Sequence, residues 1–456
     1  MLYVPIELHQ EILNVCNLKT QITILSISKY LYQNLFITNI WSKYNKKIKA
    51  LTDTILQQKK FSKLIKLSTY DNPNIYNSLL YMSNLKSLSL NFKHFRFSRF
   101  DSFCITSFHI EKMNLNELNV NYNPFINNIS HMSNLQKLYA EGPECAIKQE
   151  SINNLNLIEF YCSRNSNITY ISHMTNLKKL AIEGTCNIKQ TCIDKLSLIK
   201  FNCNHNTNIT KISHMSDLKI LFARGKSKVT QKCLNELSLT KLDLSYNTTL
   251  FDLSHMTQLK ILHANGMCGI SQSSIQGLNL IKLSINYNAD IHDLSHMTKL
   301  KILYANGICG ITQAGIKGLN LIKLSANFNK KILDISHLPL KTLYVSGDCT
   351  INPKTVNPSI LELDISNNIK FTQEILNVMN LRALSVSNNP NINNLRHMSN
   401  LKILLACGLP CNISNSSIIG LSLRKLYICN NLQIININIP HFNNTSFESC
   451  LDNIHF

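Results

Sequence analysis

Apolar residues recur along most of this chain at spacings that predict short strands joined by tight turns. Between residues 288 and 329 the frame Leu-x-x-Leu-x-(Leu, Ala or Ile) occurs twice. Its leucines are Leu300 and Leu303 in the first copy and Leu321 and Leu324 in the second. Ile291, Leu294 and Met297 precede the first copy at steps of three residues, which suit tight or 3₁₀-like turns better than a full helix. The alternate return segment, ITQAGIKGLN, predicts a short helix.

The frame belongs to a repeat of 41 residues, which is clearest in a column of asparagines. Its first members are separated by 42, 41, 41, 41 and 41 residues. They are Asn123, Asn165, Asn206, Asn247, Asn288 and Asn329, and the series closes with Asn368, Asn389 and Asn431 at changed intervals. Each repeat therefore holds two coils of about 20 residues. A coil of that size cannot bury its own apolar face, so the coils must stack into a solenoid.

Histidine and cysteine recur in the same period, which raises the question of a metal or redox site. The columns are His131, His173, His214, His255, His296 and His337, and Cys145, Cys186, Cys268, Cys309 and Cys349. Stacked strands lie about 4.8 Å apart, so residues one repeat apart are separated by about 10 Å. That distance is too long for a disulfide or for shared zinc coordination. We therefore predict that asparagine and histidine bond to turn backbone and that the cysteines are buried thiols.

The frame, closed by asparagine or cysteine, resembles the leucine-rich repeat. The resemblance covers most of the chain. It implies an α/β repeat solenoid, a horseshoe or arc of about 18 short coils. We expect these coils over residues 61–434, with a C-terminal cap over residues 435–456.

Side chains between the inward leucines would face the concave side of such a solenoid and form its partner-binding surface. Aromatic rings supply contact area at low entropy cost, and basic side chains add polar contacts. The candidates are Tyr139, Tyr161, Phe222, Tyr304, Tyr344, Lys200, Lys241, Lys282 and Lys323. The alternative is that the repeat duplicated these residues and that the rings only stabilise the sheet.

Residues 1–48 lack the repeat and predict three short helices with apolar faces. They resemble an F-box, with matches at Val4-Pro5-Ile6-Glu7, Ile12-Leu13, Ile27-Ser28-Lys29-Tyr30 and the single tryptophan, Trp41. Valine at position 4 departs from the usual leucine, and the usual Asp-Leu of the second helix is missing. The chain is thus similar to F-box/leucine-rich-repeat proteins of protists and large DNA viruses. The resemblance implies that a Skp1-like adaptor docks on Pro5, Glu7, Leu8, Ile12, Leu13, Leu25 and Trp41.

The function implied by this resemblance is a substrate-recognition subunit of an SCF-type ubiquitin ligase, in which the repeats bind an unidentified target protein. Residues 49–60 would then be a linker. The alternative is that the N-terminal residues only cap the solenoid, as repeat arrays require. The chain would in that case be a protein-interaction scaffold with no ubiquitin role.

Charge and motif content narrow the functional classes. A formal net charge of +20 would attract acidic partners, but the basic residues are spread along the chain, so a nucleic-acid-binding solenoid is less favoured. There is no Gly-rich phosphate loop, HExxH, CxxC or nucleophile elbow. We expect no enzyme activity, cofactor, metal or small-molecule substrate. Fifteen cysteines, with no signal peptide or membrane span, indicate an intracellular protein, cytoplasmic or nuclear, and in a host cell if the protein is viral.

Overall fold

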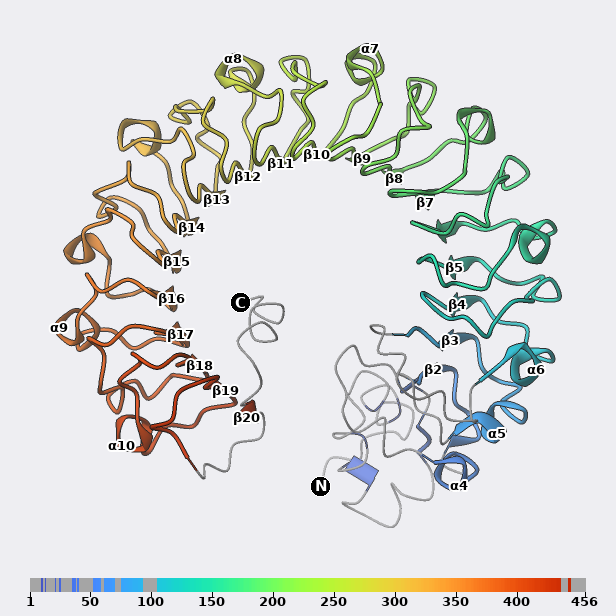
Figure 1. The fold of residues 1–456 in the computed structure, drawn as a ribbon, viewed down its shortest axis with the longest axis horizontal. Coiled ribbons are helices and arrows are strands. Elements are labelled where there is room, and N and C mark those ends of the chain that lie inside the picture. Colours follow the sequence, from blue (N-terminus) through green and yellow to red (C-terminus); the bar gives the residue numbers. More distant parts are fainter. Residues whose placement is uncertain are drawn as a thin grey trace, which may run out of the picture. The chain divides into compact units, whose positions relative to one another are not determined.

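The computed structural model describes most of the chain beyond residue 51. The described residues are Gln10, Leu13, Gln21, Ile24, Leu25 and the ranges 35–37, 39–40, 52–58, 61–69, 75–92, 105–435 and 442–443. Two compact units divide the chain, Met1–Leu237 (unit 1) and Ser238–Phe456 (unit 2). Each unit consists of successive short coils, with strands along one side and helical turns along the other (Figure 1).

Unit 1 carries the first strands, which pair in parallel with their neighbours. Its strands are β1 (Asn39–Ile40), β2 (Lys66–Ser68), β3 (Ser87–Ser89), β4 (Glu117–Asn119), β5 (Lys137–Tyr139), β6 (Glu159–Tyr161), β7 (Lys179–Ala181), β8 (Lys200–Asn202) and β9 (Ile220–Phe222). Its helices are α4 (Asp53–Leu56), α5 (Tyr76–Leu79), α6 (Ser107–Ile110) and α7 (Gln231–Asn235), with 3₁₀ helices η4 (Gln149–Ile152) and η5 (Gln190–Cys192). Asn39 of β1 aligns with Lys66 of β2. The sheet thus begins before residue 61, and α4 lies where the sequence predicted a linker.

Unit 2 repeats the same arrangement. Its strands are β10 (Lys241–Asp243), β11 (Ile261–His263), β12 (Lys282–Ser284), β13 (Ile302–Tyr304), β14 (Lys323–Ser325), β15 (Thr342–Tyr344), β16 (Glu362–Asp364), β17 (Ala383–Ser385), β18 (Ile403–Leu405), β19 (Lys425–Tyr427) and β20 (Phe442–Asn443). Its helices are α8 (Gln272–Ile275), α9 (Gln373–Leu376) and α10 (Asn415–Ile418), with η6 (Ala314–Ile316) and η7 (Pro353–Thr355). Neighbouring strands pair in register, so Leu303 of β13 aligns with Leu324 of β14.

The leucine frame forms the core between the strands and the return segments. Leu300, Leu303 and Ala305 are fully buried, and Leu321 and Leu324 occupy the same places in the next coil. Because each strand is only three residues long, the buried leucines of several coils must pack together to form a core. This geometry confirms the predicted leucine-rich-repeat solenoid.

Return segments alternate between single helical turns and tight turns, as predicted. Ala314–Ile316 forms the 3₁₀ helix η6, and the equivalent segment one repeat earlier forms α8. Between these helical segments, Met297 N–H donates to Leu294 O at 2.8 Å and Leu300 N–H donates to Met297 O at 2.9 Å. These three-residue hydrogen bonds are those of 3₁₀-like turns.

The asparagine column has the predicted structural role. Asn288 Nδ2 donates to the carbonyl oxygens of Ala264 and Ile270, both at 3.1 Å. Its Oδ1 accepts from Asp290 N–H at 2.9 Å. The side chain therefore satisfies backbone groups of two coils inside the molecule, where an unpaired group would be costly.

The histidine and cysteine columns also bond to backbone. His296 Nε2 donates to Ile275 O at 3.2 Å. Cys309 Sγ donates to Ala305 O at 3.1 Å and accepts from Asn329 Nδ2 at 3.2 Å. Cys429 differs, because its sulfur takes part in a disulfide bond.

A left-handed residue ends the strand segment of most coils. In alternate coils it is glycine, and in the others it is a larger residue with φ between 55° and 60°. The larger residues are Tyr122, Arg164, His205, Tyr246, Tyr287, Phe328, Asn367, Asn388 and Asn430. Glycine tolerates this backbone at no steric cost, and the larger side chain of one coil lies over the glycine of the next.

Candidate functional site

The strand face is the surface formed by the residues on either side of each buried central strand residue. All nine side chains predicted for the concave surface lie on it, and each is half-buried. Unit 1 holds Tyr139, Tyr161, Lys200 and Phe222, and unit 2 holds Lys241, Lys282, Tyr304, Lys323 and Tyr344. Half-burial fixes part of each side chain while leaving the rest able to contact a partner.

In unit 2, lysines and tyrosines interleave across neighbouring strands. Lys282 of β12 places its ammonium 5.3 Å from the ring centroid of Tyr304 on β13. Lys323 of β14 lies 5.8 Å from that same centroid, on the other side along the sheet. Lys323 also lies 4.4 Å from the Tyr344 centroid and donates to the Tyr344 hydroxyl at 2.8 Å. We call Lys282, Tyr304, Lys323 and Tyr344 the basic-aromatic cluster.

The lysines of this cluster are short of counter-charge. Burial, and to a smaller extent the charge of Lys241, lowers the pKa of Lys282. Burial also lowers the pKa of Lys323, where Glu362 acts in the opposite direction. Among the described residues, neither Lys282 nor Lys323 forms an ion pair. Asp364 is half-buried on β16, and burial raises the pKa of its carboxyl.

In unit 1, an acidic side chain of the strand face forms ion pairs with the lysines beside it. Tyr139 and Tyr161 stack with centroids 4.5 Å apart and planes 5° from parallel. Glu159 lies beside them and pairs with Lys179 at 2.9 Å and Lys137 at 3.4 Å. Burial would raise the pKa of the Glu159 carboxyl, but the hydrogen bond from Lys179 and the charge of Lys137 outweigh it, so the pKa is lowered.

The glutamates beside this stack affect the tyrosine hydroxyls. Burial, followed by the charges of Glu117, Glu159 and Glu141, raises the pKa of Tyr139 to about 12. The Tyr161 hydroxyl donates to Glu159 at 3.2 Å. In this part of the strand face Glu159 therefore forms ion pairs with its lysine neighbours, whereas neither lysine of the basic-aromatic cluster forms an ion pair among the described residues.

Only two residues of the predicted F-box surface fall within the described part of the chain. Leu13 and Leu25 both lie in helices and are buried, with 0% and 5% of their surface exposed. Pro5, Glu7, Leu8, Ile12 and Trp41 lie outside the described residues. In this structure the side chains of Leu13 and Leu25 are therefore not exposed to a partner.

The N-terminal segment is tied to the start of the sheet. Gln10 exchanges two 2.9 Å hydrogen bonds with the backbone of Phe36, through its amide nitrogen and its amide oxygen. Gln21 Nε2 donates to Asn39 O of β1 at 3.3 Å. Such contacts fit either an F-box-like segment fixed to the solenoid or a cap.

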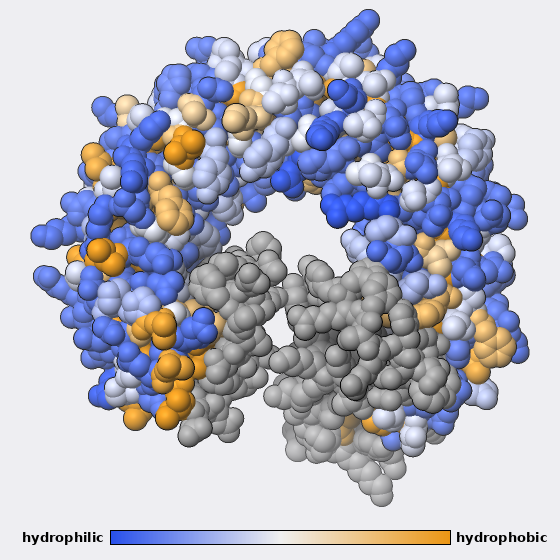
Figure 2. All heavy atoms as spheres, in the orientation of Figure 1, coloured by the Kyte–Doolittle hydropathy of each residue, from blue (hydrophilic) through white to orange (hydrophobic). Residues whose placement is uncertain are grey.

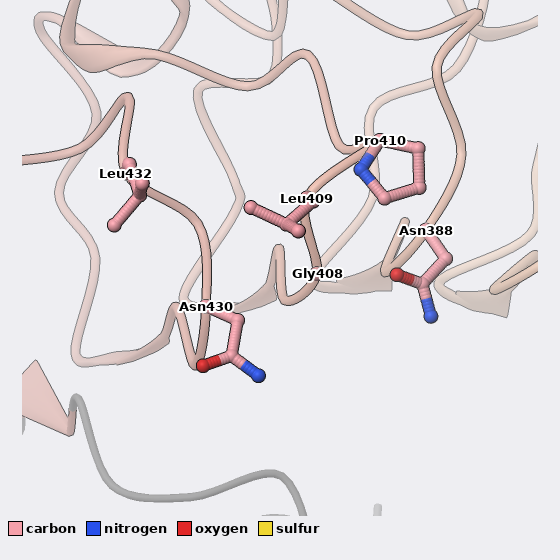
Figure 3. Close-up of a pocket in the computed structure, with 6 residues that line it drawn as sticks. All are labelled: Asn388, Gly408, Leu409, Pro410, Asn430 and Leu432. Atoms are coloured by element: carbon pink, nitrogen blue, oxygen red, sulfur yellow. The ribbon is translucent and has the colours of Figure 1, made fainter.

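Exposed apolar side chains are spread over the turns that follow the strands, the residues just before the strands and the return segments. On the face shown in Figure 2 they form small groups among hydrophilic residues, and one group lies over the last coils of unit 2. There a pocket of about 570 Å³ is lined by Asn388, Gly408, Leu409, Pro410, Asn430 and Leu432. Figure 3 shows the side chain of Leu409 extending toward the turn that carries Leu432. The residues that line this pocket are all uncharged, so the pocket offers a partner no charged group.

Two features of the strand face and its turns were not predicted from the sequence. Glu159 was not predicted, because its lysine partners, Lys137 and Lys179, lie on neighbouring strands and the repeat frame gives no weight to a single acidic residue. The large left-handed residues were missed although they keep the 41-residue period, as in Tyr246, Tyr287 and Phe328, each directly before a column asparagine. That recurrence was the available signal.

The described residues contain no group of three or more His, Cys, Asp or Glu side chains placed to hold a metal ion. Within the same residues, no helix has the length and apolar character needed to cross a membrane.

Comparisons with known proteins yield structural likenesses only. No protein-family model matches the chain, and no curated protein matches it in sequence. Among solved structures, the functional domain of InlJ from Listeria monocytogenes is 19% identical, with 77% of this chain and 71% of that chain covered and a TM-score of 0.32. Mouse RP105, in its complex with MD-1, is 16% identical, with coverages of 91% and 84% and a TM-score of 0.47. The yeast Rad7 and Elc1 complex gives 13% identity, coverages of 87% and 92% and a TM-score of 0.36.

Proposed function

We propose that this chain is a non-enzymatic, protein-binding adaptor whose partner lies across the strand face of unit 2. The observation that carries the proposal is the basic-aromatic cluster. Lys282, Tyr304, Lys323 and Tyr344 are half-exposed on four successive strands, and their rings and ammonium groups are held in place by contacts with one another. Such pre-ordered aromatic and basic side chains lose little conformational entropy on binding.

The N-terminal resemblance extends this proposal to a more specific role. If residues 1–48 act as an F-box, they dock a Skp1-like adaptor through Pro5, Glu7, Leu8, Ile12 and Trp41, and the chain selects proteins for ubiquitination. The chemistry of ubiquitin transfer then resides in other subunits. The hydrogen bonds of Gln10 and Gln21 to the start of the sheet are compatible with this role, because a docking module must be fixed to the solenoid that holds the target.

The test is co-purification of the full chain with a purified Skp1-type adaptor. The matched variant is the double substitution Pro5→Ala, Leu8→Asp, which places a carboxylate in the implied interface. We expect the wild type to retain the adaptor and the variant to lose it, while circular dichroism stays unchanged. If the wild type does not retain the adaptor, the ubiquitin role is wrong and the chain is a scaffold whose N-terminus is a cap.

A further inference from the structure

The basic-aromatic cluster has a chemistry that restricts what can bind it. Its ammonium groups carry positive charge without a carboxylate partner among the described residues. Lys282 and Lys323 occupy the same position on strands β12 and β14, and Lys241 occupies it on β10. The three lysines thus form a column in which every second strand contributes one cation.

The ring of Tyr304 has the ammonium groups of both cluster lysines near it. Ammonium groups approach the Tyr304 ring from β12 on one side and from β14 on the other. Cation–π contacts of this kind use the ring face that a nucleobase would need for stacking. The hydroxyl and ring edge remain for a partner, and these suit a peptide better than a single-stranded nucleic acid.

The spacing of the lysine column matches the spacing of every third side chain on a polyproline II helix. Strands two apart are separated by about 9.6 Å, since neighbours lie about 4.8 Å apart. A polyproline II helix rises about 3.1 Å per residue with three residues per turn, so every third side chain points the same way at intervals of about 9.3 Å. A β-strand places same-side residues about 6.6 Å or 13 Å apart, which does not match the column.

We infer that the strand face of unit 2 binds an acidic protein segment in polyproline II conformation, with a carboxylate at every third residue, running across the strands over Lys282 and Lys323. Each carboxylate faces one ammonium group, and the hydroxyl and ring edge of Tyr304 contact the segment between them. The inference rests on the proposed protein-binding function, to which it adds the chemistry and conformation of the partner.

The acidic side chains of this face are hydrogen-bonded to neighbouring residues of the chain. Asp243 is buried and accepts a hydrogen bond from Ser245 N–H at 3.0 Å. Asp364 is engaged by the Ser366 hydroxyl at 2.7 Å. Glu362, on β16, accepts from Thr342 at 3.3 Å and lies beyond the end of the lysine column. The exposed ammonium groups of Lys282 and Lys323 on β12 and β14 therefore have no ion-pair partner among the described residues.

The test uses the full chain and labelled synthetic peptides in fluorescence anisotropy. The probe is a peptide of Glu-Pro-Pro repeats. One control has Gln-Pro-Pro repeats, and a second has the same composition as the probe with its glutamates contiguous. We expect the probe to bind and both controls to bind at least about tenfold more weakly, with the difference shrinking at high salt.

Two protein variants locate the site. The double substitution Lys282→Glu, Lys323→Glu reverses the charge at two positions of the lysine column. The control, Lys299→Glu with Lys317→Glu, makes the same charge change at exposed positions of the turn and return segments. We expect the first pair to abolish binding of the probe and to bind a Lys-Pro-Pro peptide instead, while the second pair behaves as the wild type.

Three results would overturn the inference. They are equal binding of the contiguous-glutamate peptide, an equal loss in the two variants, and binding of an oligouridine without binding of the probe. If the peptides fail but a protein partner still depends on Lys282 and Lys323, the acidic segment is wrong while the protein-binding function stands.

Discussion

The ring of Tyr287 covers Gly307 so closely that a Cβ atom on residue 307 would lie 2.3 Å from a ring carbon. Carbon atoms normally approach to about 3.5–4.0 Å. Gly307 also has φ +68°, in the left-handed region. The two residues end the strand segments of neighbouring coils, so this contact couples each coil to the next at the turn.

Gly307→Ala is therefore expected to destabilise unit 2 by about 3 kcal/mol, of which about 1–2 kcal/mol comes from the left-handed backbone and the rest from the clash. Urea unfolding followed by circular dichroism measures the loss. Adding Tyr287→Ala should recover the clash contribution and leave the backbone contribution.

Two other glycines serve as controls for this substitution. Gly318 has φ +78° but nothing within 4 Å of an added Cβ, so Gly318→Ala should show only the backbone cost. Gly277 meets only an ordinary contact at 3.5 Å, and Gly277→Ala should be close to neutral. Equal losses at residues 307 and 318 would contradict the role given to the Tyr287 ring.

Asn288→Ala should cost about 3 kcal/mol of unfolding free energy. The substitution removes three hydrogen bonds to backbone and one to the Cys268 sulfur, and it leaves the buried carbonyls of Ala264 and Ile270 without this donor. Asn320→Ala, at an exposed position, is the matched control and should change stability by less than about 0.5 kcal/mol. A neutral Asn288→Ala would show that the column is not structural.

The fold could be predicted from the sequence because the same spacing of leucines recurs in coil after coil. Leu303 and Leu324 recur in a frame that only stacked coils can satisfy, and the frame also places Tyr304 and Lys323 on the strand face. The pairing of Lys282 with the ring of Tyr304 could not be predicted, because it depends on the register of neighbouring strands. The charge balance around Glu159 depends on the same register, which no single coil encodes.

Buried thiols should make stability fall in alkaline solution. Burial raises the pKa of Cys145 and of Cys203 from 9.0 to about 12. A group with a raised folded pKa contributes stability below its unfolded pKa and loses it as the pH rises toward the folded value. The urea midpoint should therefore fall between about pH 9 and pH 12, and the Cys145→Ala, Cys203→Ala variant should show a smaller fall.

The same thiols should be unreactive in the folded chain, because the thiolate is the reactive form. At pH 8 we expect iodoacetamide to modify Cys145 and Cys203 far more slowly than glutathione, and at similar rates once urea is added. Mass spectrometry of tryptic peptides gives the rates. Rapid labelling of the native chain would contradict the burial of these residues.

Glu159 should contribute to stability only when it is ionised. Its pKa is lowered in the folded chain, so its contribution is present above the usual pKa of 4.5 and is lost as the pH falls through the folded value. Glu159→Gln should unfold at lower urea concentration at pH 7 and lose less stability on acidification. Glu150→Gln, at an exposed position, should behave as the wild type. Identical acid profiles for Glu159→Gln and the wild type would show that the pairs with Lys137 and Lys179 are without effect.

The most direct test of binding across the strand face of unit 2 is site-specific photo-crosslinking. A benzoylphenylalanine replaces Tyr304 on the strand face in one full-length chain and Phe251, 58% exposed on a return segment, in another. We expect a defined protein adduct at residue 304 that is lost when Lys282 and Lys323 are changed to glutamate, and no such adduct at residue 251. The absence of an adduct at residue 304, or the same adducts at both positions, would contradict the proposed binding surface.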